Sequence, residues 1–282
     1  MRKVIATLLH LFLFVSVATA QTSYSARSYY NRGVSRYAQG DLAGAIGDFD
    51  AAIAFDANFF PAYFNRGAAR YRKGDLEGAL ADFNRALEIN PRAVEAYNGR
   101  GSARLAQGDV TGALADYTEA IKINPRCAEA LFNRANLRRD RRDFEGAMND
   151  YTAAIKGKSD FAEAYVNRGN LRYDRGDLDG AIVDYNQAMR INPRLALSYS
   201  GRGNARMIKG DLGGAMNDYD KAIALDPQYA DAYANRGLVY LAQGRRVEAE
   251  KDFAECLRLA PSLKAALAAR ISKAEQAIAA RR

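Results

Sequence analysis

The stretch that decides the fold is residues 60–93, FPAYFNRGAARYRKGDLEGALADFNRALEINPRA. Apolar residues recur at helical spacing from Tyr63 onward, Gly74 interrupts the pattern, and a second helical pattern begins at Leu76. Pro91 ends the second pattern, because proline lacks the N–H that a helix needs and clashes with the preceding turn. The stretch therefore predicts a helix, a tight turn and a second helix.

The same pattern occurs seven times at a spacing of 34 residues, without insertion or deletion. The predicted repeats are 26–59, 60–93, 94–127, 128–161, 162–195, 196–229 and 230–263. Every repeat has an arginine in its first helix and an aromatic residue in its second, as in Arg66 and Phe83. Because such a helix pair can bury its apolar face only against its neighbours, the chain is expected to be an all-α stack.

The repeat resembles that of the tetratricopeptide-repeat family over about residues 26–263, on the residues Tyr63, Gly67, Ala79, Phe83, Ala86 and Pro91. The resemblance implies a right-handed superhelical solenoid of antiparallel helix pairs. It also implies that the first helix of each repeat lines a concave groove. Physically, small residues at the helix crossing let the two helices approach closely.

One departure from the family pattern recurs along the chain. The family usually has an apolar residue where this chain has Arg66, and each repeat carries an aspartate before its second-helix aromatic residue. Charged residues in register predict structural ion pairs that join the helices of one repeat or of adjacent repeats: Arg66 with Asp82, Arg100 with Asp116 and Arg168 with Asp184. The alternative is an arginine stripe that binds anions, although the matched aspartates would neutralise it.

Two segments flank the repeats. The first 20 residues have the features of an export signal, with Arg2 and Lys3 ahead of a mostly apolar stretch and a cleavage site after Ala20. The alternative is an anchor that is not cleaved. Residues 21–25 are predicted to be a short lead. Residues 264–282 are predicted to be a capping helix with Leu263, Ala266, Leu267 and Ile271 on its apolar side; the alternative is a partner-binding tail.

Export predicts a periplasmic or secreted protein. No later segment has the roughly 18 continuous apolar residues of a membrane-spanning helix, so no stable membrane insertion is expected after cleavage. The only histidine, His10, lies in the predicted signal, and Cys127 and Cys256 are too far apart in a solenoid to pair, so both are expected to be free. The sequence therefore predicts no metal, no cofactor and no catalytic site.

The predicted groove is rich in asparagine. Five repeats have asparagine at one position of the first helix: Asn31, Asn65, Asn133, Asn167 and Asn235. The other two repeats have Gly99 and Gly201 there. A second position holds Asn136, Asn170 and Asn204. A row of amides can hydrogen-bond the backbone of an extended peptide without reading its side chains. The alternative is that these asparagines are solvated, or stabilise the bend between repeats.

Aromatic residues mark the first two repeats. Tyr30, Tyr37, Phe64 and Tyr71 are candidate anchors for a partner, or they pack between repeats. The formal net charge is +8 with acidic and basic residues interspersed, so nucleic-acid binding is not expected.

The sequence thus predicts a non-catalytic protein–protein interaction module or scaffold in the bacterial cell envelope, which binds an extended peptide or partner protein in the concave groove. The alternative is a regulatory or adaptor subunit of a cell-envelope enzyme, binding a folded partner on another face. Neither prediction sets an oligomeric state.

Overall fold

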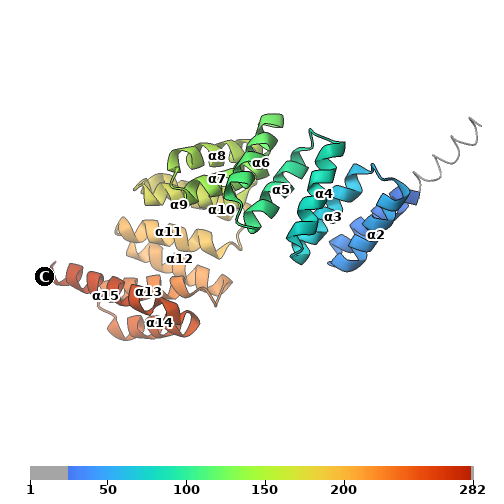
Figure 1. Ribbon diagram of the computed structural model, residues 1–282. Helices are drawn as coiled ribbons and strands as arrows, with labels where there is room; N and C mark the ends of the chain where they lie inside the picture. The colour runs from blue at the N-terminus through green and yellow to red at the C-terminus, as the bar shows by residue number, and fades with distance from the viewer. Residues whose placement is uncertain (1–24, 281–282) are drawn as a thin grey trace, which may run out of the picture. The chain divides into compact units, whose positions relative to one another are not determined.

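The computed structural model describes residues 25–280 (Figure 1). The predicted export signal and nearly all of the lead lie outside the described residues, as do Arg281 and Arg282. Residue contacts divide the chain into two compact parts, Met1–Arg141 and Arg142–Arg282, here called the N-terminal half and the C-terminal half.

Every regular element between residues 25 and 280 is a helix, which confirms the predicted all-α fold. In the N-terminal half a helix over residues 25–38 is followed by α2 (Leu42–Phe55), α3 (Phe60–Lys73), α4 (Leu76–Ile89), α5 (Val94–Ala106), α6 (Val110–Ile123) and α7 (Ala128–Asp140). The C-terminal half contains α8 (Phe144–Gly157), α9 (Ala162–Asp174), α10 (Leu178–Ile191), α11 (Ala196–Ile208), α12 (Leu212–Leu225), α13 (Ala230–Ala242), α14 (Arg246–Leu259), the short 3₁₀ helix η1 (Pro261–Leu263) and α15 (Lys264–Ala279). None of these helices is both long and apolar enough to cross a bilayer.

The turn inside five of the seven repeats is built from a glycine followed by an aspartate. Gly74 has φ +87°, a left-handed conformation that glycine adopts at little cost. Asp75 then caps α4, since its carboxylate accepts a hydrogen bond from the backbone N–H of Gly78 at 2.9 Å. The same cap begins every second helix from α2 to α12, whereas α14 begins after Arg245 without a side-chain cap.

The core of six of the seven repeats is an aromatic ring packed against a glycine, whereas the fourth repeat has Ala135 in the place of the glycine. A Cβ atom added to Gly67 would lie 3.0 Å from the ring of Phe83, so the ring needs the absence of a side chain there. Buried alanines such as Ala79 and Ala86 bring the helices together around the ring. The signature residues of the repeat are therefore core residues.

Helix α15 covers the apolar side of the last repeat in the C-terminal half. Leu267 is buried against α13 and α14, and Leu263 and Ile271 pack beside it. Ala266 was expected on this side but is exposed; Ala274 and Ile278 take part in the packing instead. The helical period from Leu267 accounts for the difference, because Ala274 is two turns further along and Ala266 points away.

Arg142 is the only non-glycine residue in the described part of the chain with a positive φ, at 64°. It occupies the place of the turn glycine, and the left-handed conformation costs an L-residue about 1 kcal/mol. We expect Arg142→Gly to raise the free energy of unfolding by up to about 1 kcal/mol. The gain is reduced because glycine also increases the conformational entropy of the unfolded chain. Urea denaturation measures this change. Arg141→Gly is the control, because Arg141 has φ −86°; an equal gain in both variants would contradict the explanation.

Candidate functional site

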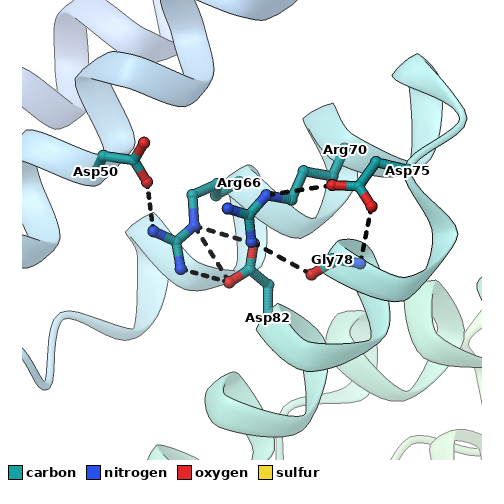
Figure 2. Close-up of polar contacts among 6 residues, drawn as sticks. All are labelled: Asp50, Arg66, Arg70, Asp75, Gly78 and Asp82. Atoms are coloured by element: carbon teal, nitrogen blue, oxygen red, sulfur yellow. Dashed lines mark hydrogen bonds and ion pairs between the residues drawn. The ribbon is translucent and has the colours of Figure 1, made fainter.

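Ion pairs join the two helices of a repeat where both helices lie in the same half, and further side-chain bonds join successive repeats there. The guanidinium group of Arg66 binds the buried Asp82 through Nε, at 3.1 and 3.0 Å from the two carboxylate oxygens, and through Nη2 (Figure 2). Arg70 adds a third donor group, with its Nη1 2.8 Å from Asp82 Oδ2. The remaining nitrogen of Arg66, Nη1, reaches back to Asp50 of the preceding repeat at 2.5 Å.

The pair of first-helix arginine and second-helix aspartate recurs in every repeat whose two helices lie in the same half. Arg100 binds Asp116 at 2.6 Å and Arg168 binds Asp184 at 2.7 Å, so the geometry brings together all three pairs considered from the sequence. The bond to the preceding repeat recurs as well, from Arg100 to Asn84, Arg134 to Thr118, Arg168 to Thr152, Arg202 to Asn186 and Arg236 to Asp220. These arginines connect successive repeats through their side chains. The contacts favour a structural role for the arginines over an anion-binding stripe.

Asparagines of the first row join neighbouring repeats by hydrogen bonds. The amide of Asn65 donates to the hydroxyl of Tyr30 at 3.1 Å and to the carbonyl of Pro61 at 2.9 Å. Further bonds run from Asn133 to Asn98 at 3.0 Å and from the buried Asn235 to Asn204 at 2.8 Å. Asn31 is exposed, and Asn167 is half-buried. Several amides are thus engaged inside the protein.

The second row accepts hydrogen bonds from buried tyrosines. The hydroxyl of Tyr185 donates to Asn170 at 2.7 Å, and that of Tyr219 donates to Asn204 at 2.8 Å. Burial raises the pKa of both tyrosines far above the ordinary value, so both hydroxyls remain protonated donors. Asn136, the remaining member, is half-buried.

A sequence signal for this bond was present but missed. Repeats with a polar residue at the second position have tyrosine in the second helix: Ser102 with Tyr117, Asn136 with Tyr151, Asn170 with Tyr185 and Asn204 with Tyr219. Repeats with an apolar residue there have phenylalanine: Val34 with Phe49, Ala68 with Phe83 and Leu238 with Phe253. The pairing indicates that the asparagine of this row serves the tyrosine hydroxyl.

Steric contacts explain why two repeats have glycine in place of asparagine in the first row. A Cβ atom at Gly99 would lie 2.8 Å from the ring of Phe83, and one at Gly201 would lie 2.6 Å from the ring of Tyr185. At these places the ring of the preceding repeat occupies the space of a side chain. The row of amides is therefore interrupted by packing.

Three of the four candidate aromatic residues are partly covered. Tyr30 packs against Phe49 and Phe59, and Phe64 packs against Phe60 and Phe83. Tyr37 is half-buried, with the guanidinium carbon of Arg72 4.7 Å from its ring centre. Tyr71 is the most open of the four, with 37% of its surface exposed.

We expect Asn204→Ala to lower the free energy of unfolding by about 1–3 kcal/mol, because it removes the oxygen that accepts hydrogen bonds from the Tyr219 hydroxyl and the Asn235 amide nitrogen. Within residues 25–280 the hydroxyl then keeps only its 4.0 Å contact with the sulfur of Met207. Urea denaturation of the purified protein gives the change. Adding Tyr219→Phe should recover part of the loss, since phenylalanine needs no acceptor. A double variant as unstable as the single one would show that the hydroxyl bond has no role.

Stability should also fall in alkaline solution. Tyrosines in the unfolded chain titrate near pH 10, whereas burial raises the pKa of Tyr185 and Tyr219 in the folded chain. The stabilising effect is complete below about pH 10 and is lost as the pH rises toward the folded pKa values. Urea denaturation from about pH 8 to about pH 11 should show the decline, and Tyr219→Phe should make it shallower. An unchanged slope would contradict this assignment.

The C-terminal half contains an apolar cleft of about 1110 Å³. Its lining includes Met207, Ile208, Leu238, Leu241 and Ile278, which come from α11, α13 and α15. Ile208 is 58% exposed, the most open of these five side chains. None of these residues was predicted from the sequence as part of a site, because the positions of Met207 and Leu241 are apolar or aromatic in most repeats.

Polar groups at the edge of this cleft are paired with each other. Arg246 lies 3.1 Å from Glu275 and 3.3 Å from Glu250. The cleft therefore presents an apolar floor with a neutralised rim, which suits an apolar side chain of a partner.

Both cysteines are free thiols, Cys127 half-buried and Cys256 buried. Burial raises the pKa of each thiol, which lowers the fraction of reactive thiolate at neutral pH. Among residues 25–280 no cluster of histidine, cysteine, aspartate or glutamate is placed to hold a metal ion.

Sequence profiles of one repeat family match most of the chain. The profile described as "TPR repeat" matches residues 33–74, 169–207 and 203–244. Two described as "Tetratricopeptide repeat" match residues 64–126 and 98–157, and residues 230–263. No curated protein sequence matches significantly.

Solved structures show the same fold. The chain is similar to MamA, with 26% identity over 57% of this chain and 95% of MamA and a TM-score of 0.52. It is similar to a tetratricopeptide-repeat protein from Parabacteroides merdae, with 23% identity over 90% of this chain and 99% of that one and a TM-score of 0.62. It is also similar to YrrB, described as a TPR protein with an unusual peptide-binding site, with 22% identity over 65% and 95% of the two chains and a TM-score of 0.53.

Proposed function

This chain belongs to the tetratricopeptide-repeat family, and from that membership we propose that it is a non-catalytic scaffold of the bacterial cell envelope that binds a peptide or protein partner on its first-helix face. Proteins of this family are interaction modules. YrrB, for example, is described as having a peptide-binding site.

The observation that carries the proposal is the apolar cleft in the C-terminal half. An open cleft lined largely by aliphatic side chains is typical of a binding site for another molecule. Ile208 is exposed and lines this cleft together with Met207 of α11 and with Leu238 and Leu241 of α13. We infer that an apolar side chain of the partner is anchored here.

The cell-envelope location rests on the export signal predicted in residues 1–20. Expression of the full chain, followed by fractionation and determination of the N-terminal residue, tests it. Recovery from the periplasm or medium with Gln21 as the first residue is the expected result. Recovery from the cytoplasm with Met1 retained would contradict the location without affecting the binding proposal.

The binding proposal is tested by capture from cell-envelope extracts with the parent chain and two variants. Ile208→Lys places a charge in the cleft, and Val247→Lys places the same charge on α14 at a residue that is 64% exposed and outside the cleft. Both variants should show the circular dichroism of the parent. A partner that the parent and Val247→Lys capture, and that Ile208→Lys loses, would support the cleft.

The opposite pattern would favour the alternative function. If Val247→Lys loses the partner and Ile208→Lys keeps it, a second-helix face does the binding, as expected for an adaptor that contacts a folded enzyme. If both variants keep the partner, the cleft is not the anchor.

A further inference from the structure

The N-terminal edge of the repeat stack lacks a contact that the stack makes elsewhere. Where a first-helix arginine has a preceding second helix in the same half, its Nη1 is bound by a side-chain oxygen of that helix. Arg66 bound to Asp50 at 2.5 Å is the first example, and Arg236 bound to Asp220 at 2.7 Å is the last. Arg32 is the corresponding residue of the first repeat, and no described second helix precedes it.

The exposure of the arginines reflects this difference. The side chains of Arg66 and Arg168 are 14% and 12% exposed, whereas that of Arg32 is 55% exposed. Nε and Nη2 of Arg32 bind Asp48, as their counterparts do in the other repeats. Among residues 25–280 no side-chain oxygen takes the place that Asp50 has beside Arg66.

The surface around Arg32 is aromatic and basic. The guanidinium carbon of Arg32 lies 5.0 Å from the ring centre of Tyr29, which stacks on Phe55 with 5.5 Å between ring centres. Phe55 is 43% exposed. The charged residues of the helix over residues 25–38 are Arg27, Arg32 and Arg36, all positive, of which Arg36 is paired with Asp41 and Asp48.

We propose that this N-terminal edge, formed by Tyr29, Arg32 and Phe55, is a docking surface for an acidic helix of another protein. The helix packs ahead of the first repeat as α2 packs ahead of α3, and its aspartate or glutamate binds Nη1 of Arg32. An apolar residue of the same helix covers Tyr29 and Phe55. The internal interfaces define this chemistry, because the same arginine nitrogen binds a side-chain oxygen of the preceding helix in each of them. That oxygen belongs to a carboxylate at Asp50 and Asp220, and to an amide or hydroxyl group in the others. A carboxylate gives the stronger, charge-assisted form of the bond.

Two other occupants fit less well. Residues 1–24 contain no aspartate or glutamate, so the chain's own leader has no carboxylate for Arg32. A second copy would have to offer the outer face of a second helix. The last of these, α14, has Ala254 where α2 has Asp50, and η1 and α15 follow it.

The test uses a fluorescent peptide with the sequence of residues 41–56, DLAGAIGDFDAAIAFD, as a copy of the acidic helix that α3 receives. Its binding to the full chain is measured by fluorescence anisotropy. The matched control peptide exchanges two neighbours, Asp50→Ala with Ala51→Asp, and so keeps composition and charge. We expect the control peptide to bind about tenfold more weakly, since it loses one charge-assisted hydrogen bond.

Variants of the protein complete the test. Arg32→Lys keeps a positive charge beside Asp48, but lysine has a single nitrogen and cannot also bind the carboxylate of the peptide in the way that Nη1 does. This variant should weaken binding about tenfold. Arg202→Lys makes the same change inside the C-terminal half and should leave binding unchanged. Absence of binding, equal binding of the two peptides, or an equal effect of the two variants would overturn the proposal. Binding only to a chain that starts at Gln21 would show that residues 1–20 cover the edge, which also overturns it.

Discussion

Replacing Asp184 with alanine is expected to lower the free energy of unfolding by about 3–5 kcal/mol, because it leaves two arginines without their buried counter-charge. The carboxylate of Asp184 is fully buried and binds Arg168 at 2.7 Å and Arg172 at 2.9 Å. Urea denaturation followed by circular dichroism measures the loss.

Glu255→Ala provides the matched control for Asp184→Ala. Glu255 pairs with Arg258 at 2.6 Å, but on the surface, where an ion pair contributes about 0–1 kcal/mol. Similar losses in the two variants would mean that burial adds nothing to the pair. A second comparison, Asp184→Asn, keeps the shape and removes the charge; a loss as large as that of alanine would assign the effect to the charge itself.

Replacing Tyr185 with alanine should be about as damaging, with an expected loss of about 3–5 kcal/mol. The ring is almost fully buried and packs against Gly169 of its own repeat and Gly201 of the next, where added Cβ atoms would lie 2.9 and 2.6 Å from it. Its removal leaves a cavity at the junction of two repeats. Thermal or urea denaturation gives the change.

Tyr185→Phe separates the ring from its hydroxyl. Phenylalanine fills the same space in three other repeats, so this variant should lose only the bond to Asn170, about 1 kcal/mol. If phenylalanine and alanine are equally unstable, the cavity explanation fails.

The period of the sequence was sufficient to predict the helix pairs, because glycine, alanine and aromatic residues at fixed spacing allow only one way of packing. It was also sufficient to match each arginine with an aspartate, since Arg66 and Asp82 recur in register. It did not show that Arg66 also reaches Asp50, because that contact depends on how far one repeat is rotated from the previous one.

The asparagines show a different limit. Their recurrence predicted a row, but one amide can face either a ligand or a neighbouring side chain, and the choice depends on distances of a few ångströms. Asn204 binds Tyr219 and Asn235, so its amide is used inside the protein. The sequence did indicate this bond, because asparagine at the second position occurs only in repeats that have tyrosine in the second helix. The cleft beside Ile208 could not be found in this way, because it is a space between helices and no single residue encodes it.

The uncapped start of α14 has a consequence for the order in which the stack opens. Each earlier second helix is held at its first turn by an aspartate, a contact of about 1 kcal/mol, whereas α14 begins after Arg245 without one. In a linear array the weakest terminal element frays first, so hydrogen exchange in the C-terminal half is expected to be fastest in α14 and α15. Because α15 contributes Ile278 to the cleft, a partner bound there would stabilise α15 and slow its hydrogen exchange. Binding would thus offset the stability that the absent cap of α14 does not supply.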